Sequence, residues 1–453
     1  MSLPRNKKDQ LLDQLARLGD ALDRGAINAA SHMLDSLPPQ EVAHLLESSP
    51  PRMRQAIWQL VDVDDEGEIL QCLSDDVQSD FLQAMQPNEI VALTEDMEAD
   101  DIADILQQLP DRLIVEVLQS MDAQDRQRVE QVIQFDESSA GGLMSTDMIT
   151  VRAPITLDVV LRFLRRHEEL PHATDTLYVV NRRDEFIGLL PLARLLVSSP
   201  SATVREIMST DITPIPVDMA DHEVALLFER NDWISAPVVS AKGKLLGRIT
   251  IDDVVDVIRD EADHSLLGMA GLSDDEDTFS SVKKTTPRRA IWLGINLITA
   301  LLASSVVKLF DGTIEHVVAL AVLMPIVASM GGVAGSQTLT VMIRGMALGQ
   351  VNKHNSRWLL NREVTVSLLN GVMWAGIMAA VVYLIYHSMT LALIMGAAIV
   401  VNLLVSALVG TQLPIVLKIL RIDPALAGSV ILTTFTDCVG FFAFLGIATL
   451  VYM

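Results

Sequence analysis

Five long apolar segments in the last third of the chain constrain its fold more than any other feature. They cover roughly residues 290–309, 316–343, 364–387, 389–417 and 426–452. Each is long enough to cross a bilayer, which takes about 20 residues of helix. In hydrocarbon, the backbone N–H and C=O groups of a spanning segment must be paired internally, as they are in a helix. The sequence therefore predicts that residues 286–453 form an all-α polytopic membrane domain with five transmembrane helices.

The charges between these segments alternate along the chain. Basic residues precede the first segment and lie in the second and fourth connections, whereas the first connection is acidic and the third has no Lys or Arg. The basic residues are Lys283, Lys284, Arg288 and Arg289, then Arg344, Lys353, Arg357 and Arg362, then Lys418 and Arg421. Basic loops mark the cytoplasmic side of a membrane. We therefore expect a multi-pass protein of a bacterial-type cytoplasmic (inner) membrane, in contact with lipid, with its N-terminus cytoplasmic and its C-terminus outside.

The remaining part of the chain is strongly acidic. Before Lys283 there are 23 Lys or Arg and 53 Asp or Glu, against 11 and 5 from Lys283 onward. A part with net charge −30 is unsuited to binding nucleic acid through its phosphates, and it repels itself unless cations gather around it. The two cysteines argue against a disulfide framework, and the polar N-terminus predicts no signal peptide.

A repeated pattern occupies the middle of the chain. "LMSTDMITVRAP" at 143–154 is matched by "IMSTDITPIP" at 207–216, and each is followed by a helical stretch, a strand with two valines and a strand containing glycine. This order resembles a tandem pair of α/β CBS domains, at 136–200 and 201–259. "GRITIDD" at 247–253 resembles the ribose-binding stretch of nucleotide-binding CBS domains, with Thr250 and Asp253 as the binding residues. ATP is a possible ligand of the second copy, although acids at a helix start also occur as a solvated face.

The flanking segments are predicted to be helical. Residues 1–135 have helical periodicity with repeated proline and acidic punctuation, which is typical of short helix starts. We expect an acidic N-terminal domain built as a superhelix of short helices. Residues 260–285 continue the last CBS helix and are expected to form a linking helix at the membrane surface.

Asp437 stands inside the last apolar segment. A carboxylate at this depth costs about 3 kcal/mol, so it usually faces a cavity, a partner or an ion pathway. Threonines surround it at 433, 434 and 436. In the second segment we expect Pro325 to break the helix, and glycines with polar neighbours favour a polar path there. The alternative for Asp437 is a protonated structural residue.

The complete order resembles the MgtE family of magnesium channels and transporters. "PIVASMGGVAGSQTLTVMIRG" and "DPALAGSVILTTFTDCVGFFAFL" are similar to the family's signatures in spans two and five. The resemblance implies a Mg²⁺-selective importer that works as a homodimer, in which Asp437 of each chain forms the magnesium site of the pore. The family usually has Asn where Val333 stands, so the choice among Mg²⁺, Co²⁺, Mn²⁺ and Ni²⁺ stays open. The expected pore-lining residues are Gly331, Gly332, Gln337, Thr433 and Thr436.

The resemblance also implies regulatory magnesium ions between the cytosolic domains, which lock the closed state. The matching acids are Asp100, Asp104, Asp232, Asp253, Asp256, Glu261 and Asp423. Two further acids of the family's linker site fall on His264 and Ser265, which predicts a weaker or shifted site there.

Two other functions stay open at this point. One is a proton-coupled transporter of Mg²⁺ or Co²⁺ that uses Asp437 as a proton relay. The other is a membrane-anchored CBS nucleotide sensor, although five spans with an internal acid exceed what an anchor needs. Nucleophile-elbow, P-loop and metal-hydrolase motifs are absent from the sequence, so we do not expect an enzyme.

Overall fold

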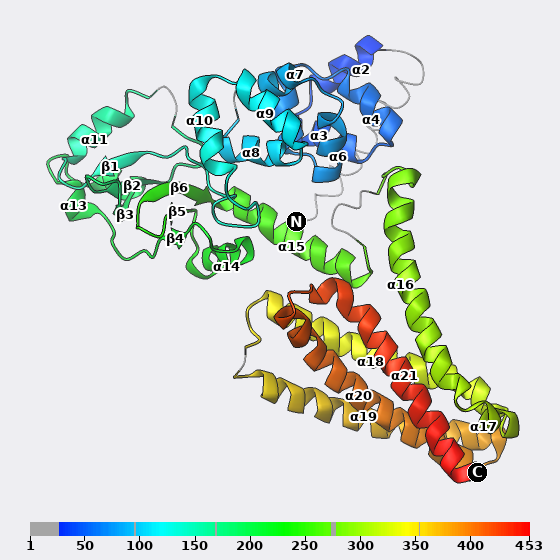
Figure 1. Ribbon diagram of the computed structural model, residues 1–453. Helices are drawn as coiled ribbons and strands as arrows, with labels where there is room; N and C mark the ends of the chain where they lie inside the picture. The colour runs from blue at the N-terminus through cyan, green and yellow to red at the C-terminus, as the bar shows by residue number, and fades with distance from the viewer. Residues whose placement is uncertain (1–26, 95–96, 168–169, 273–277, 353) are drawn as a thin grey trace. The chain divides into compact units, whose positions relative to one another are not determined.

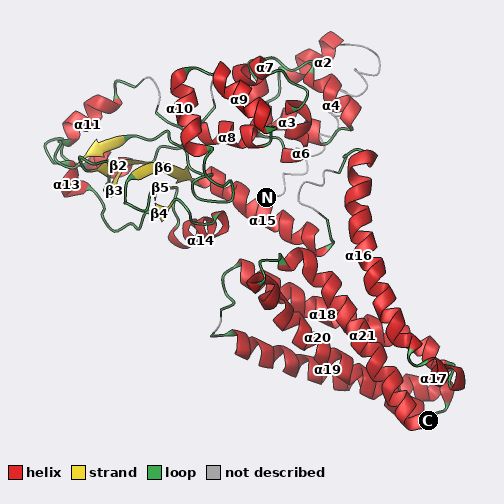
Figure 2. Ribbon diagram, viewed as in Figure 1, coloured by secondary structure: helices red, strands yellow, loops and turns green. Residues whose placement is uncertain are grey.

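A computed structural model describes residues 27–94, 97–167, 170–272, 278–352 and 354–453. The first 26 residues of the expected helical domain and Lys353 lie outside the described residues. The chain forms two compact units: Met1–Asp260 with Asp275–Ser281, and Glu261–Asp274 with Val282–Met453. Figure 1 labels their helices and strands, and Figure 2 separates the two kinds of element by colour.

The first unit begins with a series of short helices. They are α2 (Ile27–Leu34), α3 (Pro39–Glu47), α4 (Pro51–Trp58), α5 (Glu66–Gln71), α6 (Asp75–Leu82), α7 (Pro87–Leu93), α8 (Ala99–Gln107), α9 (Asp111–Ser120) and α10 (Ala123–Val132). Proline opens α3, α4 and α7, where its missing N–H would have no helical partner. One face of each helix contributes to a common core that includes Leu46, Leu70 and Leu106. The predicted helical N-terminal domain is confirmed.

Two copies of one α/β pattern follow. The first contains β1 (Thr150–Arg152), α11 (Leu157–Leu164), β2 (Thr176–Val180), β3 (Phe186–Pro191), α12 (Leu192–Val197) and α13 (Val204–Ile207). The second contains β4 (Ile215–Pro216), α14 (Asp221–Asn231), β5 (Ser235–Val239), β6 (Leu245–Thr250) and α15 (Ile251–Met269). The sheets have orders β1-β2-β3 and β4-β5-β6, each with a parallel and then an antiparallel pair. The predicted repeat is therefore present in the fold.

The two copies also exchange backbone pairing. Ser145, ahead of the first sheet, pairs with Arg248 in β6, and Ser209 pairs with Leu189 in β3. A glycine sits next to each crossing point: a Cβ added to Gly247 or Gly188 would lie 2.6 Å from a serine carbonyl oxygen. Only glycine allows such a close approach of two backbones.

The segment that joins the repeat to the membrane helices, expected to form a linking helix over 260–285, is helical in its first part. Helix α15 ends at Met269. Gly271 adopts a φ of 72°, and the Leu272 N–H donates to the Leu267 carbonyl, which is a helix-ending arrangement that glycine favours. Residues 273–277 of this segment lie outside the described residues, and the next helix begins at Val282.

The second unit holds five helices that are long and apolar enough to cross a membrane, as the sequence predicts. They are α16 (Val282–Lys308), α18 (Ala319–Ala347), α19 (Ser356–Tyr386), α20 (Met389–Ile419) and α21 (Pro424–Tyr452), with the short α17 (Asp311–His316) between the first two. The bundle of α18, α19, α20 and α21 is visible in Figure 1. The expected break at Pro325 is wrong, because α18 continues through it.

Two polar side chains of α20 fix how closely α18 packs on it. Asn402 is fully buried, and its Nδ2 donates to the Val327 carbonyl of α18 at 2.8 Å. Ser406 donates to the Gly331 carbonyl at 2.8 Å. Side chains of a neighbouring helix thus hydrogen-bond to two α18 carbonyls, and such interhelical bonds are common between packed membrane helices. Gly331 leaves room for the amide, since a Cβ there would lie 2.1 Å from Asn402 Nδ2.

Candidate ion sites

Asp437 lies midway along α21 and opens onto a cavity. The cavity has a volume of about 390 Å³ and lies between α16 and α21, whose facing residues line it. Its lining comprises Leu293, Asn296, Leu297, Thr299 and Ala300 of α16, and Thr433, Thr434 and Asp437 of α21. Thr433 and Thr434 precede Asp437 by one helical turn, which places the three side chains on one face. The segment expected to carry an ion path therefore contains a hollow with a carboxylate in its wall.

The threonine hydroxyls in this cavity have a fixed direction. Thr433 donates to the Ser429 carbonyl at 3.0 Å, and Thr434 donates to the Val430 carbonyl at 2.7 Å. Since a hydroxyl has one hydrogen and two lone pairs, both oxygens are left as acceptors. The α21 side of the cavity therefore offers only oxygen acceptors, which suits a cation or its water shell.

The other expected pore residues are placed differently from one another. Gln337 is exposed on α18, and nothing lies within 4 Å of the Cβ position of Gly332. Gly331 is buried against Asn402. Thr436 is fully buried, and its hydroxyl donates to the Thr433 carbonyl at 3.0 Å. Gly331 and Thr436 thus pack between helices of this chain, and their assignment to the pore lining stays a prediction.

Val333 marks the departure from the family pattern. It lies on α18 two residues after Gly331 and is 57% exposed. An isopropyl group at this position offers water or an ion no polar atom.

A cluster of acids forms in the first unit where α8 approaches the start of α15. Asp100, Asp101 and Asp104 come from α8, and Asp253 and Asp256 come from α15. Asp100 is 6% exposed, and its Oδ1 has no hydrogen-bond partner among the described residues. The sequence identified four of these acids, but Asp101 was not among them. Adjacent acids on one helix do not reveal which of them face another domain.

Burial and mutual repulsion raise the pKa of each carboxyl in this cluster. Burial is the larger cause for Asp104, whose pKa is raised to about 8, and repulsion from Glu137 and Asp101 adds to it. Burial raises the pKa of Asp253 to about 7 against the opposing effect of hydrogen bonds from Thr250, and it raises that of Asp101 to about 6. The pKa of Asp100 lies well above its usual range for the same reason. A group of carboxyls that resists ionisation is one that a divalent cation would stabilise.

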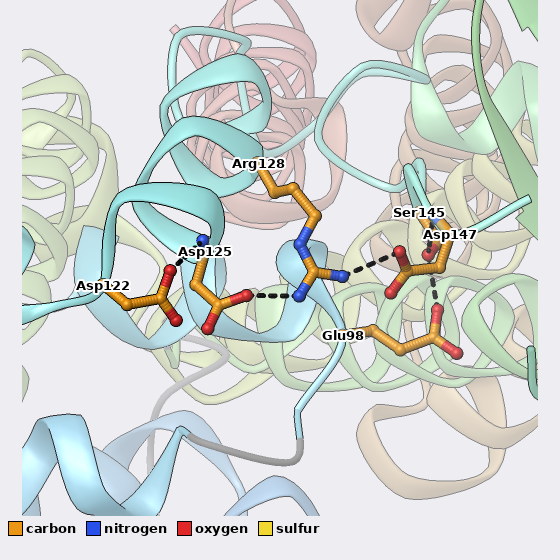
Figure 3. A network of polar contacts seen from close by, with 6 residues as sticks. All are labelled: Glu98, Asp122, Asp125, Arg128, Ser145 and Asp147. Atoms are coloured by element: carbon orange, nitrogen blue, oxygen red, sulfur yellow. Dashed lines mark hydrogen bonds and ion pairs between the residues drawn. The ribbon is translucent and has the colours of Figure 1, made fainter.

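A polar network joins α10 and the residue before α8 to the segment that precedes β1 (Figure 3). Arg128 of α10 bridges Asp125 of its own helix and Asp147, with a distance of 3.0 Å from Nη1 to Asp147 Oδ1. The Ser145 hydroxyl donates to Glu98, just before α8, at 2.5 Å. Ser145 is also the residue whose backbone pairs with Arg248 in β6. The first turn of α8 is therefore tied to the sheet from which α15 emerges.

The remaining expected metal ligands are more exposed. Asp232 ends α14 in a left-handed conformation and is exposed, as is Glu261 on α15. Asp423 caps α21 by accepting hydrogen bonds from the N–H groups of Ala425 and Leu426. Among the residues that the structure describes, no three His, Cys, Asp or Glu side chains are arranged to hold a metal ion.

His264 contacts Asp423 directly. Its Nε2 lies 3.0 Å from Asp423 Oδ2, and both side chains are about one-third exposed. One turn later, a Cβ added to Gly268 would lie 3.2 Å from the Ala425 Cβ, so the end of α15 packs closely on the start of α21. At the position where the family resemblance implies an acid, an imidazole instead contacts the carboxylate expected to bind an ion.

The expected nucleotide residues lie at the junction of β6 and α15. The backbone N–H and the hydroxyl of Thr250 both donate to Asp253 Oδ2, at 3.2 and 2.8 Å. Thr250 is buried. In the first copy, Pro191 takes the place of Thr250 and Arg194 that of Asp253. Asp253 therefore belongs both to this junction and to the acidic cluster.

Three family profiles match the chain. The MgtE divalent cation transporter profile covers residues 324–447, the MgtE intracellular N domain covers 37–138, and CBS domains cover 140–199 and 204–260. The magnesium transporter MgtE of Thermus thermophilus is 30% identical over 438 residues, which are 96% of this chain and 97% of that protein. The magnesium transporter MgtE of Bacillus subtilis is 28% identical over 425 residues, 94% of each chain. A solved cytosolic domain of the Mg²⁺ channel MgtE in complex with ATP is 31% identical and covers 54% of this chain and 99% of its own, with a TM-score of 0.49.

Proposed function

The chain belongs to the MgtE family of divalent cation transporters, and on that premise we propose that Asp437 is the site through which it imports Mg²⁺ across the cytoplasmic membrane. This family is a class of transporters rather than of enzymes. The observation that carries the proposal is the opening of Asp437 into a hollow of about 390 Å³ between two helices that are long and apolar enough to span a membrane. An ionisable side chain at membrane depth that faces a cavity marks an ion or substrate path.

The ion is expected to pass with water still attached. Magnesium loses water reluctantly and usually contacts one or two carboxylates while it keeps several waters. Asp437 supplies one carboxylate, and Thr433 and Thr434 present hydroxyl oxygens beside it. A site of this kind holds the ion weakly enough to release it, which conduction requires.

A homodimer supplies the second carboxylate. A twofold axis between two chains would bring two copies of Asp437 to one path. Two carboxylates without a cation repel each other, and a divalent cation between them removes the repulsion. The dimer also accounts for the exposure of Gln337 on α18, because this amide would then face the shared path.

Cytosolic magnesium closes this path. The acids of α8 and α15 are held together with their pKa values raised to about 6, 7 and 8 at Asp101, Asp253 and Asp104. A Mg²⁺ ion that binds them favours the docked arrangement of the two elements by mass action. Since α15 continues into the second unit, docking at its start is expected to influence the membrane helices, so that import falls as internal Mg²⁺ rises.

ATP is the proposed ligand of the second CBS copy. Asp253 and Thr250 would hold the ribose, because its hydroxyl groups can donate hydrogen bonds to a carboxylate. Asp253 is also part of the acidic cluster. ATP and regulatory Mg²⁺ are therefore expected to affect each other's binding, because they share one carboxylate.

A growth assay tests the transport site. In a bacterial host that requires added magnesium, we expect the wild-type chain to restore growth and Asp437→Asn to fail. Asp311→Asn is a matched control, because Asp311 is an exposed acid at the start of the short α17. The N-terminus is expected on the cytoplasmic side, which cysteine labelling at the two ends would check. Full growth with Asp437→Asn, at equal membrane abundance, would exclude this carboxylate as the transport site.

A further inference from the structure

Helix α16 contains a polar side chain that the proposed path does not yet use. Asn296 lies seven residues beyond Arg289, which is about 10 Å of helix, and so falls inside the hydrocarbon region. Ala303 is the one buried residue of α16, and the Asn296 side chain is exposed. An exposed amide in lipid has no hydrogen-bond partner and is costly. Its placement therefore calls for a polar environment.

The cavity beside Asp437 supplies that environment. Asn296 and Thr299 line it from α16, and Thr433, Thr434 and Asp437 line it from α21. Asn296 and Thr299 are three residues apart, so both project from one face of α16. Leu293, Leu297 and Ala300 complete the α16 wall with apolar groups. The polar side chains of two helices thus meet across one hollow.

We propose that Asn296 and Thr299 form the second wall of the ion site and bind the water shell of a hydrated divalent cation whose charge Asp437 balances. This inference rests on the proposed transport function and deepens it, since α16 then takes part in selecting the ion. Six waters at about 30 Å³ each occupy about 180 Å³. The cavity of about 390 Å³ holds such a shell with room for exchange.

The direction of the hydrogen bonds fits metal-bound water. Waters around a cation point their oxygens at the metal and their hydrogens outward, so the surrounding protein must present acceptors. The Thr299 hydroxyl donates to the Asn296 carbonyl at 2.8 Å, as Thr433 and Thr434 donate to carbonyls of α21. All three hydroxyl oxygens are thereby left as acceptors, and the Asn296 side-chain oxygen adds a fourth. A bare ion would need direct ligands, whereas these groups are suited to its waters.

Mg²⁺ flux into liposomes that contain the purified full-length protein tests this inference. Asn296→Leu removes the amide at similar volume, and we expect the Mg²⁺ concentration for half-maximal flux to rise about tenfold, with weaker discrimination against Ca²⁺. Thr299→Val removes one hydroxyl and is expected to raise the Mg²⁺ concentration for half-maximal flux about threefold. Ser305→Ala is the matched control, because Ser305 is a polar residue of α16 outside the cavity, and its flux curve should match the wild type.

The outcomes separate this inference from the function on which it rests. If Asn296→Leu and Thr299→Val both give the wild-type curve while Asp437→Asn abolishes flux, α16 does not contribute and the transport site stands. If Asp437→Asn conducts normally, the proposed function itself fails. Should Asn296→Leu fold poorly by size-exclusion chromatography, Thr299→Val decides the question, because exchanging a hydroxyl for a methyl group of similar size changes packing little. A higher half-maximal concentration with unchanged folding supports the role of α16.

Discussion

The binding of regulatory magnesium is expected to depend strongly on pH. The pKa of Asp104 is raised to about 8, that of Asp253 to about 7 and that of Asp101 to about 6, with burial as the main cause in each. An acid whose pKa is raised in the folded state stabilises that state fully below its unfolded pKa, and this stability is lost as pH rises through the folded pKa. Without Mg²⁺, the free energy of unfolding of the cytosolic unit should therefore fall between about pH 4 and pH 8. Bound Mg²⁺ should offset that fall.

The same values give the size of the effect on binding. At pH 7, Asp104 is about nine-tenths protonated, Asp253 about half and Asp101 about one-tenth, so a cation that needs all three ionised displaces about 1.5 protons. The apparent affinity for Mg²⁺ is then about tenfold higher at pH 8 than at pH 7. Asp104→Asn removes the largest contribution and leaves a change of about twofold over the same interval.

Calorimetric titration of Mg²⁺ into the full-length protein in detergent measures the affinity for Mg²⁺ and the number of protons displaced. Repeating the titration in two buffers with different ionisation enthalpies counts the protons released. Glu223→Gln is a matched control, because Glu223 is an exposed acid on α14, and it should release the same number as the wild type. An affinity that does not change between pH 7 and pH 8, with no proton release, would refute the assignment of these acids to a cation site.

Three further outcomes follow from the contacts. Gly331→Ala should lower the free energy of unfolding by about 2 kcal/mol, because its Cβ would displace the buried Asn402 amide. Thermal unfolding in detergent measures this loss, with Gly332→Ala as the neutral control. Equal losses of stability in the two variants would contradict the prediction. Asp253→Asn should weaken binding of a fluorescent ATP analogue as well as of Mg²⁺, and unchanged ATP affinity would remove it from the nucleotide site. His264→Asp should enlarge the rise in melting temperature produced by Mg²⁺, because it replaces the imidazole at Asp423 with a second carboxylate, and a smaller rise would contradict this.

The sequence predicts the architecture well because its main signals are local. Span length, loop charge and the repeated "MSTD" stretch each depend on residues close together in the chain, and the structure has the five long helices and the two matching sheets. The expected break at Pro325 is wrong, because α18 continues through the proline. The packing of α18 depends on distant residues, since Asn402 and Ser406, which bond to its carbonyls, lie on α20, about 75 residues later in the chain.

In the candidate sites, too, some residues can be recognised from the local sequence and others only from the fold. Asp437 can be recognised because a carboxylate in an apolar run is unusual by itself. The role of Asn296 cannot be read from the sequence, since it depends on α21, more than 130 residues away, facing α16 across the cavity. Likewise, Gly331 and Gly332 are neighbours with identical side chains, yet one packs on Asn402 and the other has open space at its Cβ position.

Magnesium flux through the purified protein in liposomes tests the central claim most directly. With a Mg²⁺-sensitive dye inside, the wild-type protein should carry Mg²⁺ inward at low internal concentration and slow as internal Mg²⁺ accumulates. Asp437→Asn should reduce flux to that of empty liposomes, while cytosolic Mg²⁺ binding measured by calorimetry stays unchanged. Flux of Asp437→Asn at the wild-type rate would contradict the account, because the ion would then cross the membrane without the carboxylate that the structure places beside the cavity.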